Sequence, residues 1–310
     1  MRKLIICALA AATAFGAFAA IDAQTLWKSG DRGVTAYRIP ALCTAPNGDL
    51  IAVCDARKEG YGDLNHAKPI NISCRRSTDG GKTWTDPVDT WTWKWTDDEH
   101  WAGSDPSLIV DSDTKKIFLF YNVWESKKRH GIFQFYVQES SDNGKTWSEP
   151  RDISSDIAFP EWPFGKPVKN GDECKVVELR DGSWMINSRW RGGGRQIHVS
   201  KDRGDTWESW YDKSLFDPQC NAQIMRYGKV LLFSNCKADG RRNLYLRASL
   251  DDGKTWGEGI CIQPQGAAYS DITVLGNGDI GVLYEGAGYN TINYAVVPRA
   301  DVVAEFKDKE

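Results

Sequence analysis

Short apolar runs separated by turn residues, rather than long helical periods, dominate the pattern of hydrophobic and polar positions along this chain. The runs Leu50–Cys54, Ser183–Ile186 and Ile280–Tyr284 each closely follow an Asn-Gly or Asp-Gly pair. Such a pair between β-rich segments is the strongest short-range signal for a β-hairpin. Similar but weaker turns lie at Asp111–Lys115 and Tyr227–Lys229. The pattern therefore predicts an all-β protein.

A turn motif of the form Ser-x-Asp-x-Gly-x-Thr-Trp occurs four times, at Ser77–Trp84, Ser140–Trp147, Ser200–Trp207 and Ser249–Trp256. The Asp carboxylate can accept backbone N–H groups of its own turn, and Gly supplies the positive φ that closes it. We expect the Trp to pack beneath the turn. The motifs start 63, 60 and 49 residues apart, which is too long for a solenoid but suits blades of four short strands.

These repeated units predict a six-bladed β-propeller. Five units are visible in the sequence. The sixth is inferred from length, because the chain after residue 23 corresponds to about 48 residues per blade when divided by six. The stretch Asp156–Asp172, with three prolines, is predicted to be an inserted loop.

The first 23 residues differ from the rest of the chain. Arg2 and Lys3 precede an apolar, Ala-rich run from Leu4 to Ala20, which is typical of a secretory signal peptide and is short for a spanning helix. Cleavage is expected after Ala19 or Ala23. We therefore predict a signal peptide at residues 1–23, a single propeller domain at residues 24–310, and a secreted or periplasmic protein without membrane insertion after signal removal.

Composition narrows the class of partner. The formal net charge is −3, so there is no basic surplus of the kind that binds nucleic acid, and a small-molecule partner is expected. The protein is expected to be a monomer. Outside Cys7, seven of the eight cysteines remain, an odd number without a CxxC pair, beside only four histidines. Small buried residues explain them better than disulfides or zinc. We expect no metal and no organic cofactor.

Four arginines stand at the ends of predicted inner strands: Arg38, Arg57, Arg189 and Arg241. The inner strands of a propeller converge on one axis, so side chains at their ends share one cleft. Any single one of these arginines is more easily explained as a solvated residue at a strand end. Together they predict a pocket for an anion.

The segment Tyr37-Arg38-Ile39-Pro40, followed by four turns of the Asp-box type, resembles the exo-α-sialidases of bacterial glycoside hydrolase family 33. The resemblance spans nearly the whole chain after residue 23. It implies an enzyme that releases terminal sialic acid from sialylated glycans. Asp boxes also occur in binding propellers and in other glycosidases. A sugar-binding propeller, a glycosidase for another acidic sugar, and a sialidase with an anhydro or transfer product therefore remain alternatives.

The resemblance implies that Arg38, Arg189 and Arg241 clamp the sialic acid carboxylate, which a planar guanidinium matches with two hydrogen bonds. Arg242 is the alternative to Arg241. Arg57 is expected to line the same pocket, against O4 or the N-acyl group of the sugar. Asp105 corresponds to a segment beside the N-acetyl pocket.

The catalytic residues implied by the resemblance are Asp63, Glu173 and Tyr284. Asp63 would be the acid/base catalyst on a glycine-containing loop, and Tyr284 the nucleophile. The anomeric carbon of a sialoside already bears a carboxylate, which would repel an Asp or Glu nucleophile, whereas a phenol needs only a base, here Glu173. Tyr269 is the competing tyrosine, ranked second as a wall residue. Two candidates for the acid that orients the first arginine stay open, Asp301 and Glu305.

Overall fold

The computed structural model describes residues 21–64, 69–96, 99–127, 130–157 and 172–304, and most of its regular structure is β-strand. The elements are β1 (Ala23–Lys28), η1 (Asp31–Gly33), β2 (Ala36–Thr44), β3 (Leu50–Arg57), β4 (Ile70–Ser77), β5 (Val88–Trp91), β6 (Lys94–Trp95), β7 (Glu99–Val110), β8 (Ile117–Lys127), β9 (His130–Ser140), β10 (Arg151–Asp152), α1 (Ser154–Ile157), β11 (Asp172–Glu178), β12 (Trp184–Arg189), β13 (Arg195–Ser200), β14 (Glu208–Asp212), β15 (Gln223–Tyr227), β16 (Val230–Cys236), β17 (Arg242–Ser249), β18 (Ile260–Val274), β19 (Ile280–Gly286), η3 (Ala287–Tyr289), β20 (Thr291–Val297) and α2 (Arg299–Ala304). No helix among these residues is long and apolar enough to cross a membrane.

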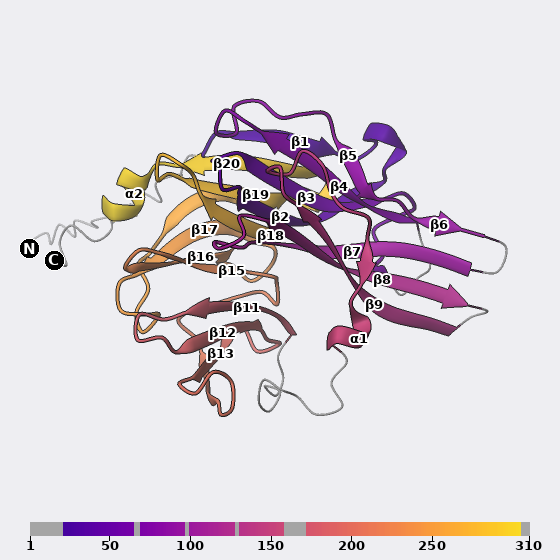
Figure 1. The fold of residues 1–310 in the computed structure, drawn as a ribbon. Helices are drawn as coiled ribbons and strands as arrows, with labels where there is room; N and C mark the ends of the chain where they lie inside the picture. Colours follow the sequence, from indigo (N-terminus) through magenta and orange to yellow (C-terminus); the bar gives the residue numbers. More distant parts are fainter. Residues whose placement is uncertain (1–20, 65–68, 97–98, 128–129, 158–171, 305–310) are drawn as a thin grey trace, which may run out of the picture.

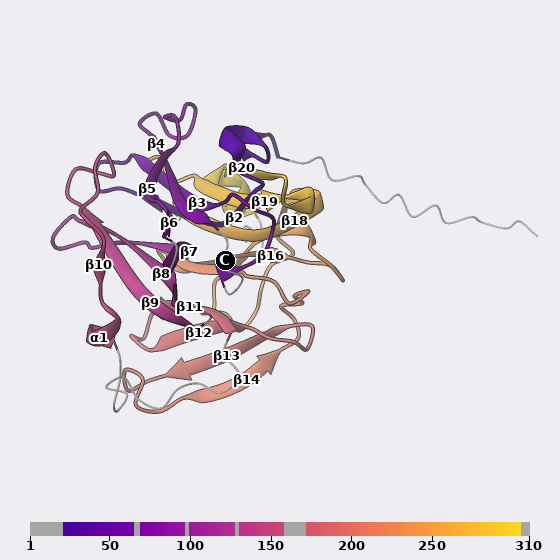
Figure 2. The same cartoon turned by 90° about the vertical axis from the view of Figure 1, so that its right-hand side faces the viewer.

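Consecutive strands pair antiparallel into blades that surround a common centre (Figures 1 and 2). The blades are β2–β5, β7–β10 with β6 at its edge, β11–β14, β15–β18, and β18–β20 completed by β1. The long strand β18 belongs to two blades, because its first half pairs with β17 and its second half with β19. The predicted β-propeller is confirmed. The described strands form five such blades, so the predicted number of six is not confirmed.

Two further predictions meet the limits of the described residues. The predicted signal peptide falls almost wholly on residues 1–20, and most of the predicted inserted loop falls on residues 158–171; both stretches lie outside the part of the chain that the structure describes. The first strand begins at Ala23, where it pairs with Ala295 of the last strand, one residue before the predicted start of the domain.

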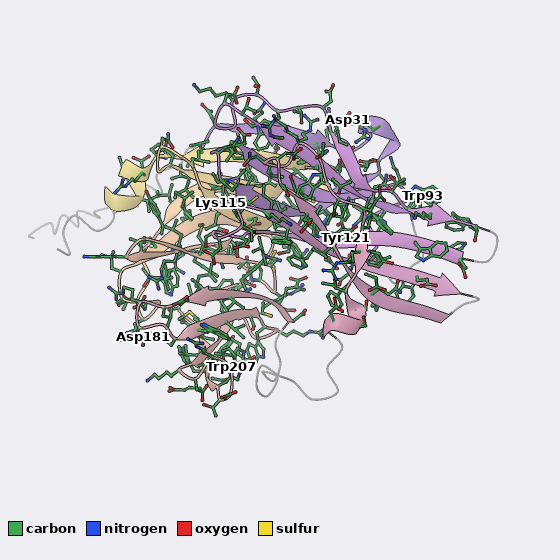
Figure 3. All side chains as sticks on the ribbon, viewed as in Figure 1. Asp31, Trp93, Lys115, Tyr121, Asp181 and Trp207 are labelled. Atoms are coloured by element: carbon green, nitrogen blue, oxygen red, sulfur yellow. The ribbon has the colours of Figure 1, made fainter. Side chains whose placement is uncertain are left out.

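The core lies between neighbouring sheets, where side chains fill the space (Figure 3). Between the β18–β20 blade and the β2–β5 blade, for example, Trp27, Tyr37, Leu283 and Tyr294 are buried in one apolar cluster. Burial of this apolar area, at about 25 cal/mol per Å², holds the blades to one another. All seven cysteines after the first 23 residues are free thiols, and only Cys174 is exposed.

Each Asp-box turn is built as predicted. In the first, Ser77 Oγ accepts the N–H of Gly81 at 2.9 Å, and the Asp79 carboxylate accepts the N–H and the hydroxyl of Thr83 at 2.9 and 2.6 Å. Trp84 packs edge-on against Tyr294 of the neighbouring blade, with ring centroids 5.2 Å apart. The same hydrogen bonds recur in the other three motifs.

The first box glycine should be intolerant of a side chain. Gly81 has φ +89°, and a Cβ there would lie 2.3 Å from Tyr294 Cε1, whereas Gly48 has φ +90° with no atom within 4 Å. We expect Gly48→Ala to lower the free energy of unfolding by about 1–2 kcal/mol through backbone strain alone. Gly81→Ala should lower it by roughly 2–5 kcal/mol, because overpacking adds to the same strain. Urea unfolding of both variants measures the difference, and equal losses would contradict a close contact with Tyr294.

The box carboxylates should stabilise the fold at neutral pH more than in acid. Hydrogen bonds from the threonine of each turn lower the pKa of Asp79, Asp142 and Asp202 to about 2. A carboxylate with a lowered pKa in the folded state contributes stability that is complete above the unfolded pKa of about 4 and is lost as pH falls through 2. We therefore expect Asp142→Asn to be less stable than the wild type at pH 6. This difference should shrink between pH 4 and pH 2 in thermal melts; a constant difference would contradict the assignment.

A β-bulge interrupts four of the innermost strands. Two residues face one on the partner strand at Ile39 in β2, Asp105 in β7, Glu173 in β11, and between Ala267 and Ser270 in β18. Ile39, Asp105 and Glu173 have φ of 55°, 59° and 40°, which is uncommon for residues other than glycine. Bulges turn side chains out of the regular alternation of a strand and recur beside active sites. Here they direct residues from several blades toward one place.

Candidate active site

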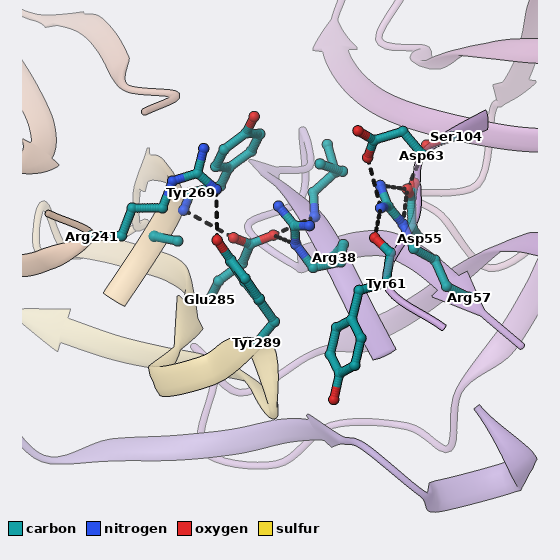
Figure 4. A network of polar contacts seen from close by, with 12 residues as sticks. Arg38, Asp55, Arg57, Tyr61, Asp63, Ser104, Arg241, Tyr269, Glu285 and Tyr289 are labelled. Carbon is teal, nitrogen blue, oxygen red and sulfur yellow. Dashed lines mark hydrogen bonds and ion pairs between the residues drawn. The ribbon is translucent and has the colours of Figure 1, made fainter. Parts of the chain in front are cut away.

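Residues from all five blades or their loops meet at a cavity of about 440 Å³. Its lining includes Arg38, Asp63, Asp105, Glu173, Arg189, Arg241 and Tyr269. Six of the eight predicted site residues are therefore brought together by the fold, although β2, β7, β11, β12 and the segment before β17 are far apart in sequence. Arg57 and Tyr284 are not among the lining residues. Figure 4 shows part of the site from close by.

The arginine side of the cavity combines three blades. Arg38 comes from β2, Arg189 ends β12, and Arg241 immediately precedes β17. Arg242, the alternative to Arg241, is exposed and pairs with Asp239. Three guanidinium groups on this side of the cavity offer forked donors to a carboxylate or phosphate.

Glu285 holds the first of these arginines, Arg38. Its Oε1 accepts Arg38 Nε at 2.6 Å and the backbone N–H of Ile39 at 2.9 Å, while Oε2 accepts the N–H of Tyr269 at 3.2 Å. Glu285 is fully buried. The prediction of Asp301 is wrong because that residue is exposed on α2, and Glu305 lies outside the described residues. The strand that ends in Glu285 was itself singled out, but only for its tyrosine.

Tyr289 also belongs to the arginine cluster, and sequence reasoning missed it. Arg38 lies over its ring, 4.1 Å from the centroid, and Arg241 Nη1 donates to its hydroxyl at 2.8 Å. The phenol thus bridges two arginines whose like charges would otherwise repel each other. Figure 4 shows this ring beside both guanidinium groups. Tyr289 is in the short helix η3, where no repeat or motif marked it.

Tyr269 carries the geometry that was predicted for Tyr284. Its hydroxyl donates a short hydrogen bond to Glu173 Oε1, and Arg189 Nη1 lies 3.1 Å from the same hydroxyl and 2.8 Å from the carboxylate. Burial and the negative charge of Glu173 raise the pKa of Tyr269 above its usual value, so the phenol is protonated at rest. A phenol hydrogen-bonded to a carboxylate is an arrangement in which the carboxylate can take the proton as the oxygen attacks.

The pairing of Glu173 with Tyr284 is therefore wrong. Tyr284 is only 1% exposed, packs in the apolar cluster between β16–β17 and β18–β20, and is hydrogen-bonded to Gln263. Its neighbour Glu285 points to the opposite face, as successive residues in a strand do. Because Glu285 faces the arginines, Tyr284 faces the core. A bulge at Tyr269 aims that tyrosine at the cavity instead.

Asp63 stands on the opposite wall, on the loop after β3. Its side chain is 78% exposed and is held by one ion pair, from Arg57 Nη1 at 2.8 Å. Arg57 does not bind at the cavity as predicted, because it is itself buried and its guanidinium is taken up by Asp55, Asp63 and the carbonyl groups of residues 61 and 62. In the part of the chain that the structure describes, no group of three or more His, Cys, Asp or Glu side chains could hold a metal ion.

Comparison with known proteins gives a consistent family. The model of the BNR repeat-like domain matches residues 48–192 and 160–282. The chain is 32% identical over 361 residues to a sialidase of Micromonospora viridifaciens, covering 91% of this chain and 55% of that protein. It is 28% identical over 334 residues to a sialidase of Bacteroides fragilis, covering 83% of this chain and 61% of that one.

Solved structures agree with the fold. The Hadza microbial sialidase Hz136 superposes with a TM-score of 0.81 at 25% identity, covering 91% of this chain and 69% of that one. The NanB sialidase of Streptococcus pneumoniae superposes with a TM-score of 0.73 at 18% identity, covering 90% of this chain and 71% of that one. The chain spans a little over half the length of the two curated relatives above.

Proposed function

The chain belongs to the family of BNR repeat-like domain proteins, and from this premise we propose that it is an exo-α-sialidase that releases terminal sialic acid from sialylated glycans. The observation that carries the proposal is one cavity in which three arginines face a hydrogen-bonded Tyr269–Glu173 pair. The similarity to curated sialidases supports the same substrate class. A binding propeller would need the arginines but not the tyrosine and its base.

The proposed binding mode assigns the substrate carboxylate to Arg38, Arg189 and Arg241. Glu285 and Tyr289 keep two of these guanidinium groups in place, so their donors are already oriented when the anion enters. Pre-oriented donors bind an anion without a further cost of reorganisation. Asp105 lines the same cavity and is available to the polar substituents of the sugar.

The proposed reaction retains the configuration of the sugar. Glu173 takes the proton of Tyr269 as the phenol oxygen attacks the anomeric carbon, and Asp63 gives a proton to the leaving oxygen as the glycosidic bond breaks. Asp63 then removes a proton from water, which displaces the tyrosine oxygen, and Glu173 returns its proton to Tyr269. Sialidases with a tyrosine nucleophile depart from the usual pair of carboxylates in glycosidases. No metal or organic cofactor takes part in these steps.

Two further proposals concern context. The character of residues 1–23 supports export, to the periplasm or the medium, where sialylated glycans of other cells are accessible. The low net charge supports a protein that acts on glycans and does not bind nucleic acid, and we further propose that it acts as a monomer.

The test of the proposed function is release of sialic acid from a sialylated oligosaccharide, followed by proton NMR. We expect the α-anomer of free sialic acid to appear first and then to mutarotate. Initial release of the β-anomer would contradict the retaining route. An anhydro sugar, or transfer of the sugar to another glycan, would show that the reaction is not hydrolysis but one of these two alternatives. Binding of the glycan without any product would make the protein a sugar-binding propeller.

A further inference from the structure

A buried carboxylate that sequence reasoning did not single out lies behind the acid/base wall of the cavity. Asp55 is on β3, two residues before Arg57, and is fully buried. Its Oδ2 accepts Arg57 Nε at 3.1 Å and Nη2 at 2.9 Å, together with a hydrogen bond from the Ser104 hydroxyl. Its Oδ1 accepts the backbone N–H of Asp105 at 3.1 Å. One side chain therefore connects two blades.

Two of these contacts, with Arg57 and with Asp105, lead to the lining of the cavity. Arg57, anchored at Asp55, donates from Nη1 to Asp63 and to the carbonyl groups of Tyr61 and Gly62, as Figure 4 shows for the labelled residues. The exposed Asp63 side chain has no other ion pair among the described residues. On the other side, Asp105 occupies a bulge with φ +59°. This backbone conformation costs energy and persists only where neighbouring contacts impose it.

A comparable arrangement is found on the arginine side of the cavity, where the arginine belongs to the next blade. Glu285, fully buried on the second strand of its blade, holds Arg38 and accepts the N–H of the bulge residue Ile39, whose φ is +55°. Asp55 likewise lies on the second strand of its blade, holds an arginine, and accepts the N–H of a bulge residue in the next blade. Two buried carboxylates, each on the second strand of its blade, thus hold an arginine and a bulge on different walls of one cavity.

We propose that Asp55 is a positioning residue for the acid/base step: through Arg57 it fixes Asp63, and through the backbone of Asp105 it fixes the adjoining wall. This inference rests on the proposed sialidase function. It assigns Arg57 to the loop of Asp63. Burial raises the pKa of Asp55 to about 7 against the opposing charge of Arg57.

A positioning role predicts an effect that depends on the leaving group. A sugar leaving group needs a proton from Asp63, whereas a nitrophenolate departs almost unaided. Misplacement of a catalytic group by about 1 Å lowers the rate on the order of 10²-fold. We therefore expect Asp55→Asn to lower kcat/KM for a sialyl-oligosaccharide roughly 10- to 100-fold, and to leave kcat/KM for a nitrophenyl sialoside within about threefold. The ratio kcat/KM is compared because it reports only the steps up to cleavage of the glycosidic bond, whereas the later attack of water uses Asp63 with both substrates.

Asp217 provides the matched control. It is equally buried, pairs with the buried Arg195, and accepts the N–H of Cys220, but it does not line the cavity. Asp217→Asn should cost comparable stability and affect both substrates alike. Equal losses on both substrates in Asp55→Asn, as in the control, would overturn the positioning role and leave a structural one.

Hydrogen exchange of the full chain tests the same idea without any turnover. In Asp55→Asn, amide exchange should accelerate at residues 58–64 and at Ser104 and Asp105, and in Asp217→Asn it should not accelerate there. Unchanged exchange at both segments would also overturn the proposal. If the wild type releases no sialic acid, the proposed function fails, while the exchange result still decides whether Asp55 fixes these two walls.

Discussion

Replacing Tyr269 by Phe is expected to lower kcat for a sialyl-oligosaccharide by at least 10³-fold, on the order of the losses seen when other enzymes lose a covalent nucleophile. The fold should persist, because Glu173 keeps its ion pair with Arg189 at 2.8 Å and the ring remains. Tyr284→Phe should keep wild-type turnover to within about twofold. It removes only a buried hydroxyl, whose hydrogen bond is worth about 1 kcal/mol of stability.

A covalent label separates the two tyrosines more directly than rates do. A sialic acid with fluorine at C3 and a good leaving group at C2 slows the departure of the sugar from the enzyme, because fluorine destabilises the positive charge that develops in the second step. Mass spectrometry of the digested protein should then find the sugar on the peptide that contains Tyr269. A label on Tyr284, or full activity of Tyr269→Phe, would remove Tyr269 from the mechanism.

The choice between these tyrosines shows where sequence reasoning reached its limit. The segment Leu283-Tyr284-Glu285 matches a family motif, but a motif does not tell which of its residues faces the site. Strand alternation did carry a signal: Glu285 is the only charged residue of β19, and its neighbour must point the other way. The bulge that turns Tyr269 inward has no comparable sequence signature, because it is defined by how β18 pairs with the neighbouring strand β19.

Local features were predicted well for a physical reason. The hydrogen bonds of the serine, aspartate and threonine that close an Asp box lie within eight residues, so the motif contains nearly everything that shapes the turn. The number of blades, by contrast, is not a local feature. It depends on how strands from distant segments pair, and β18 serves two blades at once. A mean blade length cannot anticipate a shared strand.

The prediction that Arg57 lines the cavity failed for another reason. The type of this residue and its place at the end of a strand suggested a substrate contact, yet Asp55 stands two residues earlier on the same face of β3. Side chains at i and i+2 of a strand are neighbours, and a carboxylate there competes with any ligand for the guanidinium. That spacing could have been read from the sequence. The bulge at Asp105 could have been read as well, because Pro106 follows it and proline within a strand often marks a bulge.

Neutralising Glu285 should cost more stability than any other conservative change at the site. Glu285→Gln leaves the nearly buried Arg38 without its counter-charge, and breaking one side of a buried ion pair costs about 3–5 kcal/mol. The amide also places an N–H donor against the N–H of Arg38, Ile39 or Tyr269, because all three now donate to the carboxylate. We therefore expect a fall in the melting temperature of roughly 6–20 °C, at about 2–4 °C per kcal/mol.

The activity of Glu285→Gln should fall together with its stability, for a related reason. The carboxylate of Glu285 fixes Arg38 in the clamp and the backbone of Tyr269 beside it, so its loss disturbs binding and attack together. Hydrogen bonds to charged groups are worth about 1.5–3 kcal/mol, which corresponds to a fall in kcat/KM of roughly 10- to 150-fold. Asp301→Asn, at the exposed carboxylate first considered for this role, should change neither quantity. If Glu285→Gln were as stable as the wild type, other groups around the cavity would balance the positive charge of Arg38. The orienting role of Glu285 would then have to be withdrawn.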